Sequence, residues 1–165
     1  MSVVQKITPN LWFDTQAEEA AKLYVSIFNN AHIGRISRYR AEGYEIHGMA
    51  EGTVMTVQFT IEGQDFVALN GGPHFQFNEA ISFVVNCESQ EEVDYFWEKL
   101  AEGGDPDAQQ CGWLKDKYGV SWQIVPIILA EMINDSDPDK SQRVSKAMLA
   151  MKKLDIDKLK QAYSG

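Results

Sequence analysis

The chain has 165 residues, of which 44% are hydrophobic and 24% charged, proportions that are ordinary for a globular protein. The formal net charge of -9 excludes general affinity for nucleic acid, because neutralising phosphates requires clustered Lys and Arg. The sequence shows no apolar run near 18 residues, no leader pattern, and only two cysteines, Cys87 and Cys111. We therefore expect a cytoplasmic protein with reduced thiols and no membrane partner.

The first part of the chain reads as a strand, a helix and then three strands. An amphipathic helix is predicted over residues 17–28, with Asp14 or Thr15 as its N-terminal cap. Strand-forming or alternating patterns occur over residues 7–13, 33–39, 53–61 and 65–70. The turn at Glu62-Gly63 predicts that the last two strands form an antiparallel hairpin, and the glycine-containing stretch 40–52 predicts a loop.

The second part follows a similar order after the bridge Gly71-Gly72-Pro73. An apolar strand is predicted over residues 81–85, and an amphipathic helix over 90–100 follows polar caps. Two further strands are expected over residues 111–116 and 121–127, and another near Gln109 is poorly marked. Helices are then expected over residues 127–133 and 140–153, with a short one at the end.

The two parts match each other. Each has a strand, a polar cap, a Glu pair and an apolar helical face, and the pairs are Glu18-Glu19 and Glu91-Glu92. This indicates an internal duplication of a β-α-β-β-β module and an α+β fold. We expect one domain over residues 1–128, with modules at about 1–72 and 78–128, followed by a C-terminal helical extension over 129–165.

Several segments carry a resemblance to a known family; they are ITPNLWFD with EEAAKLYVSIF, FVALNGGPHFQFNEAISFVV, KYGVSWQIVP and PDKSQRVSKAMLAMKKLDI. The chain resembles the PhnB-like, or 3-demethylubiquinone-9 3-methyltransferase-like, family. That family belongs to the vicinal-oxygen-chelate superfamily of glyoxalases, bleomycin-resistance proteins and ring-cleaving dioxygenases. The resemblance implies paired βαβββ modules that curl around a shared cleft, and a homodimer.

The positions at which metal enzymes of this superfamily carry His or Glu ligands hold weaker groups here. They correspond to Pro9, Ala80, Gln123, and Ala68 or Asn70. Amide carbonyls alone bind divalent ions weakly, so we predict no metal and no cofactor. The family name suggests methyl transfer, but Gly71-Gly72 precedes proline and a strand instead of opening a helix that could hold S-adenosylmethionine.

Aromatic and amide side chains predict a binding site for a small apolar or aromatic molecule. The candidate ligand-binding residues are Asn70, His74, Phe75, Trp113 and Gln123. Alternation requires Trp122 and Gln123 to face opposite sides of their strand. Several alternatives stay open: the rings pack in the core, His74 is a solvent-facing loop residue, the protein is a lyase or isomerase with a weak metal site completed by His74, it is a methyltransferase, or it acts mainly as a dimerisation module.

Overall fold

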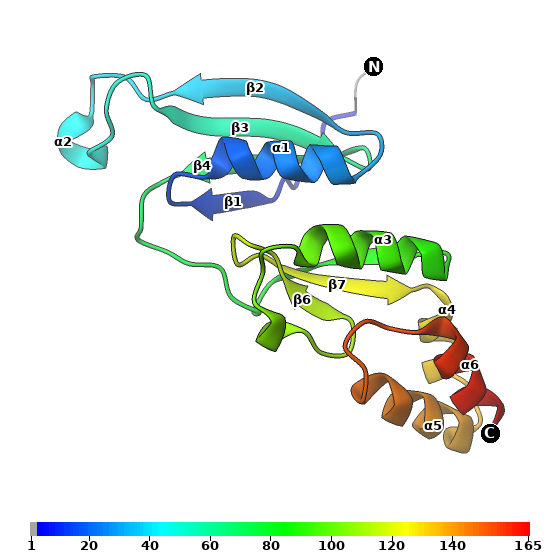
Figure 1. Cartoon of the computed structure of the whole chain (residues 1–165). Helices are drawn as coiled ribbons and strands as arrows, with labels where there is room; N and C mark the ends of the chain where they lie inside the picture. Colours follow the sequence, from blue (N-terminus) through cyan, green and yellow to red (C-terminus); the bar gives the residue numbers. More distant parts are fainter. Residues whose placement is uncertain (1–2) are drawn as a thin grey trace. The chain divides into compact units, whose positions relative to one another are not determined.

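The computed structural model describes residues 3–165, and the chain divides into two compact units after Phe77 (Figure 1). We call them the N-terminal unit and the C-terminal unit. Among the described residues, no helix has the length and apolar character that crossing a membrane requires. That residues 1–128 act as one domain stays a prediction.

The N-terminal unit is a β-α-β-β-β module with an additional short helix. Its elements are β1 (Asn10–Phe13), α1 (Ala17–Ile27), β2 (His32–Arg38), α2 (Tyr44–His47), β3 (Val54–Ile61) and β4 (Gln64–Asn70). The sheet has the strand order β1-β4-β3-β2, with β1 parallel to β4 and the other pairs antiparallel. The hairpin of β3 and β4 is confirmed, whereas α2 lies in the stretch that we expected to be a loop.

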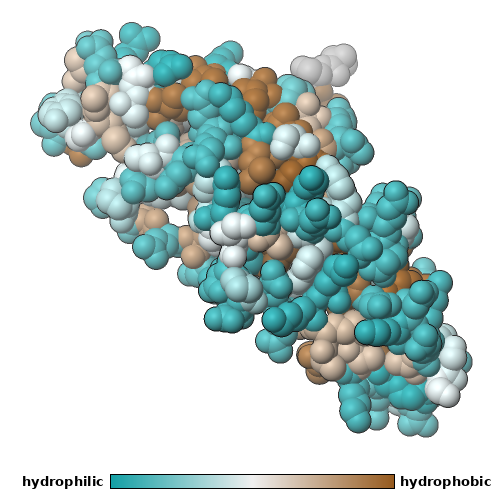
Figure 2. Space-filling model, in the orientation of Figure 1, coloured by the Kyte–Doolittle hydropathy of each residue, from teal (hydrophilic) through white to brown (hydrophobic). Residues whose placement is uncertain are grey.

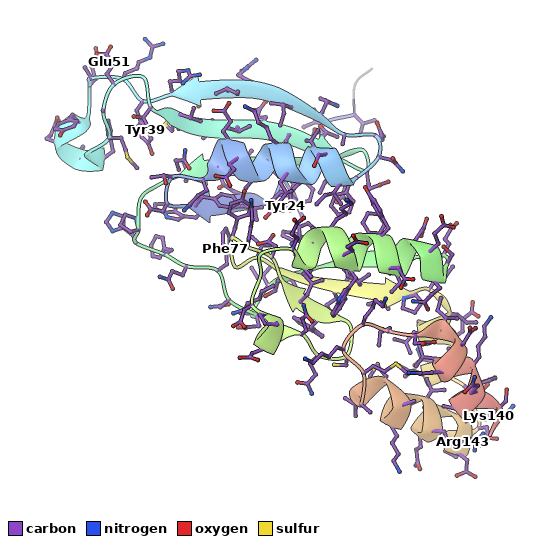
Figure 3. All side chains as sticks on the ribbon, viewed as in Figure 1. Tyr24, Tyr39, Glu51, Phe77, Lys140 and Arg143 are labelled. Atoms are coloured by element: carbon purple, nitrogen blue, oxygen red, sulfur yellow. The ribbon has the colours of Figure 1, made fainter. Side chains whose placement is uncertain are left out.

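Helix α1 covers one face of this sheet (Figure 1). Its buried side includes Ala17, Ala20 and Ala21, whose small side chains let the helix approach the strands closely. Tyr24 is also buried and lies with its ring centroid 6.0 Å from that of Phe59 on β3 (Figure 3). This helix-on-sheet layer forms the core of the unit.

The start of α1 is capped differently from our prediction. No side chain at the N-cap position, Gln16, makes a capping hydrogen bond. Instead the Asn70 side chain at the end of β4 accepts a hydrogen bond of 2.8 Å from the Ala17 N–H. The same amide donates to the Val54 carbonyl at 3.1 Å, and Asn70 is only 4% exposed. A buried residue distant in sequence thus satisfies the helix end.

The C-terminal unit contains a smaller sheet and most of the helices. Its elements are β5 (Ser82–Cys87), α3 (Gln90–Ala101), the 3-10 turn η1 (Pro106–Ala108), β6 (Trp113–Lys115), β7 (Ser121–Pro126), α4 (Ile128–Ile133), α5 (Pro138–Leu149) and α6 (Ile156–Ser164). The strand order is β5-β7-β6, with β5 parallel to β7 and β6 antiparallel to it. The predicted repeat is present, since both units place the first strand parallel beside the last.

The second module has one strand fewer than we expected. The poorly marked strand near Gln109 is replaced by η1 and a single bridge between Gln110 and Trp113. Only residues 102–112 connect α3 to β6, whereas residues 28–53 connect α1 to β3 and hold β2. Pro106 in the shorter connection also lacks the N–H that a ladder requires. This segment therefore turns instead of forming an outer strand.

Helix α3 begins with the polar caps that the sequence predicted. The Ser89 side chain accepts a hydrogen bond from the Glu92 N–H, and the Glu92 carboxylate accepts one from the Glu88 N–H. The two bonds resemble a capping box, except that the backbone donor to Glu92 is Glu88 and not the N-cap residue Ser89. Val93, Phe96 and Leu100 are buried, while the visible outward side of the helix is mainly hydrophilic (Figure 2).

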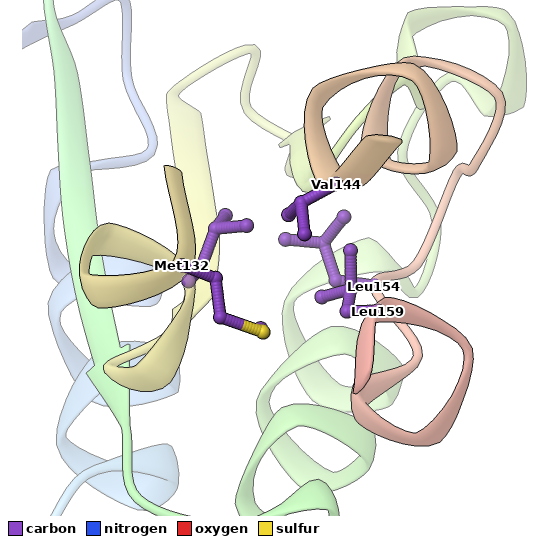
Figure 4. Packing of buried hydrophobic residues seen from close by; sticks show 5 residues of the cluster. Met132, Val144, Leu154 and Leu159 are labelled. Carbon is purple, nitrogen blue, oxygen red and sulfur yellow. The ribbon is translucent and has the colours of Figure 1, made fainter. Parts of the chain in front are cut away.

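The C-terminal helices enclose a hydrophobic cluster of their own (Figure 4). Its buried members are Leu129, Met132, Val144, Leu154 and Leu159. Arg143 of α5 donates hydrogen bonds to the carbonyls of Ala162 and Tyr163 at the end of α6 (Figure 3). These bonds satisfy carbonyl groups that the helix end leaves without partners.

This helical extension is fastened to the rest of its unit by polar contacts. The Gln90 side chain on α3 donates to the Leu154 carbonyl at 3.1 Å and accepts from the Ile156 N–H at 2.7 Å. In the loop before β6, the Cys111 N–H donates to the Met151 carbonyl at 2.7 Å. The extension is thus an integral part of the C-terminal unit.

Replacing Asn70 with alanine tests the role of its amide in capping α1. We expect Asn70→Ala to lower the free energy of unfolding by about 1–3 kcal/mol, because the Ala17 N–H and the Val54 carbonyl both lose their partner. Urea denaturation measures the change. Asn86→Ala, at an exposed position of β5, is the control and should stay within about 0.5 kcal/mol of wild type. Equal effects of the two changes would contradict the capping role.

Replacing Leu154 with alanine tests the packing of the extension. We expect a loss of about 2–5 kcal/mol of stability, because Leu154 is fully buried and its loss leaves a cavity. The same change at Leu149, which is 58% exposed, should cost little. Thermal and urea unfolding of the two variants give the comparison, and a Leu154→Ala protein as stable as Leu149→Ala would show that the cluster does not hold the extension.

Candidate functional site

The two faces of the three-stranded sheet differ in burial, because one packs against α3 and the other is mostly half-buried. Along β7, Trp122 and Ile124 are buried on the side of α3, so Ser121 and Gln123 lie on the opposite side. We call this opposite side the open face; it comprises Ser82, Val84, Trp113, Lys115, Ser121 and Gln123. The prediction that Trp122 and Gln123 face opposite ways is confirmed.

Trp122 is held in the core by a buried carboxylate. Its indole N–H donates to Asp116 Oδ2 at 2.9 Å, and Asp116 is only 3% exposed. The other carboxylate oxygen accepts from the N–H groups of Tyr118 and Val120, which close the turn between β6 and β7. Trp122 therefore has a structural role, and the turn sets which residues of β6 and β7 oppose each other.

Strand register arranges the open-face side chains in two rows. Lys115, Ser121 and Ser82 oppose one another in the first row. Trp113, Gln123 and Val84 form the second row. The Gln123 amide donates to the Ser82 hydroxyl at 2.9 Å, so it joins the two rows and has one hydrogen bond already satisfied.

A hollow of about 280 Å³ lies at the Lys115 end of the open face. Its lining residues are Glu79, Ala108, Gln110, Cys111, Trp113, Leu114, Lys115 and Ser121. Ser121 is only 1% exposed, and its hydroxyl has no hydrogen-bond partner among the described residues. Buried hydroxyls are normally hydrogen-bonded, so this group marks the hollow as a place where a polar atom of a ligand would be favoured.

An ion pair lies at the edge of the hollow. The Lys115 ammonium is 2.5 Å from a Glu79 carboxylate oxygen. The lysine side chain is 26% exposed and the glutamate side chain 60%, so the lysine is the more enclosed of the two. The hydrogen bond from Lys115 lowers the pKa of Glu79 below its ordinary value. The Glu79 carboxylate therefore stays charged at neutral pH.

A second group of aromatic residues lies in the N-terminal unit. The Trp12 indole donates to the Gly72 carbonyl at 2.9 Å, and the rings of His74 and Phe75 meet Trp12 edge to face, with centroids 6.5 and 4.9 Å away. Trp12 lies directly on Gly71, where a Cβ atom would come within 2.2 Å of the indole ring. The bridge after β4 thus folds back onto its own unit.

The candidate residues predicted from the sequence fall into separate groups. His74 and Phe75 come together at Trp12, and Trp113 and Gln123 are direct neighbours across β6 and β7. Asn70 is buried with its amide engaged in capping α1. That these residues contact a ligand stays a prediction.

Sequence reasoning missed Ser121, Lys115 and Glu79 as candidates. A signal was available for two of them, because the tight turn over residues 116–120 pairs Lys115 with Ser121. Alternation relative to Trp122 would then have placed the pair on the open face. Glu79 lies outside any strand, and its approach to Lys115 carries no local signal.

The residues at the superfamily's metal-ligand positions do not fit a metal centre. Ala68 is fully buried, Asn70 is engaged in the fold, and Ala80 lies before β5. Among residues 3–165, no group of three or more His, Cys, Asp or Glu residues is arranged to hold a metal ion. We derive no metal-dependent step for this chain.

Gly71-Gly72 does not form a nucleotide-binding turn either. Gly71 lies beneath the Trp12 ring, and Gly72 has a φ of 91°, which turns the chain toward the aromatic segment. The next regular element is the strand β5, so the glycines are not followed by a helix whose N-terminus could bind a phosphate or carboxylate group.

The two cysteines differ in their surroundings. Cys87 is fully buried, and burial, together with the nearby Glu92 charge, raises the pKa of its thiol to about 12. This thiol stays protonated and unreactive at neutral pH. Cys111 is half-buried, has a φ of 40°, and lines the hollow.

Comparisons with known proteins agree with this fold. Residues 5–125 match the family model described as 3-demethylubiquinone-9 3-methyltransferase. A PhnB protein from Bacillus cereus is 41% identical, and the match covers 74% of this chain and 99% of that one with a TM-score of 0.62. No match to a protein of curated function was found.

More distant structures share only the fold. Protein PA1353 from Pseudomonas aeruginosa is 17% identical over 74% of this chain and 98% of its own, with a TM-score of 0.55. The fosfomycin resistance protein FosX from Listeria monocytogenes is 18% identical over 81% of this chain and 100% of its own, with a TM-score of 0.50.

The family match ends at residue 125, so the segment 138–156, which we included in the resemblance, lies outside it. The matched region contains both units' sheets, the bridge between them and all the candidate ligand-binding residues. The chain belongs to the PhnB-like family of the vicinal-oxygen-chelate fold, the family named for 3-demethylubiquinone-9 3-methyltransferase.

Proposed function

We propose that this protein binds a small apolar or aromatic molecule at the hollow on the open face, without a metal ion. The observation that carries the proposal is the Ser121 hydroxyl, which is buried at a hollow of about 280 Å³ and has no hydrogen-bond partner within residues 3–165. A buried hydroxyl without a hydrogen bond lowers the stability of a protein. Proteins often retain such a destabilising group where it serves a function.

The lining of the hollow suits this class of ligand. Trp113 offers a half-buried aromatic surface, while Ser121 and Gln110 offer polar groups that can orient a ligand. Binding sites for small molecules combine an apolar surface with a few placed polar groups. The amide of Gln123, the register partner of Trp113, donates a hydrogen bond to the Ser82 hydroxyl.

Binding of the neutral fluorescent probe N-phenyl-1-naphthylamine tests the proposal. We expect saturable binding that is unchanged by the chelator EDTA, and a loss of about tenfold in affinity for Trp113→Ala, since a buried aromatic contact is removed. Fluorescence titration measures the affinity. Tyr95→Ala on α3, where the side chain is 40% exposed, is the control and should bind as wild type does. Loss of binding with EDTA, or equal binding by Trp113→Ala, would contradict the proposal.

We also propose that the chain forms a homodimer, as the family resemblance implies. In support, β5 is an edge strand of its sheet, Val84 on it is 49% exposed, and Ile81 just before it is 74% exposed. Unpaired strand edges with exposed apolar residues favour association. Light scattering at micromolar concentration should give twice the mass of one chain, and a single-chain mass would reject the dimer.

A further inference from the structure

The hollow on the open face also indicates the charge of its ligand. Resting on the proposed function, we infer that the ligand is a small amphipathic anion. Its carboxylate, sulfonate or similar group binds Lys115 and Ser121, its apolar part lies against Trp113, and Glu79 competes with it for Lys115.

The position of the two donors supports this inference. Lys115 and Ser121 are register partners across β6 and β7, both on the open face. Side chains directly opposite in an antiparallel pair start about 5 Å apart at Cβ, so one anionic group can contact both. An ammonium group donates hydrogen bonds and accepts none, and a hydroxyl without a partner can donate its hydrogen as well. The pair therefore matches an acceptor-rich anion.

The apolar part of the inferred ligand follows from the second row of open-face residues, which contains Trp113. Trp113 lies two residues before Lys115 on β6, and residues two apart share a face of a strand. Its ring and Ala108 line the same hollow as Lys115 and Ser121. A ligand that reaches the Lys115–Ser121 pair thus has an apolar surface beside its charged group.

Glu79 is the more exposed member of the ion pair. It lies in the segment before β5, outside regular structure, and its side chain is more than twice as exposed as that of Lys115 (60% against 26%). Because exposed ion pairs contribute little to stability, separating Glu79 from Lys115 costs little free energy. Its carboxylate presents to Lys115 the same chemical group that an anionic ligand would present.

The overall charge of the protein explains why binding of an anion should depend on Lys115. A chain with a formal net charge of -9 repels anions in general. Favourable binding of an anion therefore depends on a local donor pair. Neutralising Lys115 should abolish the preference for an anion, whereas neutralising a distant lysine should not.

Two probes that differ by one charged group separate this inference from the proposed function. The anion 8-anilinonaphthalene-1-sulfonate has the same aromatic body as N-phenyl-1-naphthylamine plus a sulfonate. We expect wild-type protein to bind the anion more tightly than the neutral probe. Lys115→Met should weaken binding of the anion about tenfold more than binding of the neutral probe, which is the size of one charge-assisted hydrogen bond. Lys115→Arg should keep most of the preference, and Lys146→Met, an exposed change on α5, should have no effect.

Two further variants test Ser121 and Glu79. Ser121→Ala should weaken binding of the anion severalfold without lowering the melting temperature, because the hydroxyl makes no hydrogen bond in the described part of the chain that the change could remove. Glu79→Gln should strengthen binding of the anion severalfold, whereas Glu98→Gln, an exposed change of equal charge on α3, should not.

The outcomes distinguish the two ideas. If the neutral probe binds at Trp113 but the anion binds no tighter, the inference fails and the proposed function stands. If Lys115→Met weakens both probes equally, Lys115 does not select charge and the inference fails. If neither probe binds, the proposed function fails together with the inference. Far-UV circular dichroism confirms that each variant is folded.

Discussion

The hydrogen bond from the Trp122 indole to the buried Asp116 carboxylate helps to fix which residues of β6 and β7 oppose each other. It anchors Trp122 under α3, and the same carboxylate closes the turn that joins β6 to β7. A slip of one residue in either strand would exchange the two faces of the sheet. The open face, with the opposed Lys115 and Ser121, follows directly from this fixed register.

The fold could be predicted largely from sequence because its signals are local. Apolar spacing indicated α1 and α3, polar caps marked the start of α3, a tight turn marked the hairpin of β3 and β4, and the repeat related the two modules. The missing strand near Gln109 could not be located in this way. Its absence depends on the length of the connection after α3, and the repeat itself favoured a complete second module.

The candidate site was less predictable, because its residues act over long distances in the sequence. Asn70 had the residue type expected of a ligand-binding amide, yet its partners are Ala17 and Val54, which no local pattern indicates. Gly71 likewise had the type expected of a flexible turn. A glycine is required at this position because the Trp12 ring lies on it. This contact joins β1 to the end of β4. Residue type alone therefore did not show which candidate side chains have their polar groups engaged in the fold.

The C-terminal extension supports one wall of the hollow. The N–H groups of Cys111 and Gly112 donate to the carbonyls of Met151 and Lys152, at 2.7 and 2.8 Å. Gly112 is packed tightly there, since a Cβ atom would come within 3.1 Å of both Leu154 and the Ile124 carbonyl. Cys111 forms part of the wall of the hollow. Because residues 151 and 152 lie beyond the family match, that wall of the hollow is held by a segment outside the matched region, so the shape of the hollow depends on residues that the family match does not cover.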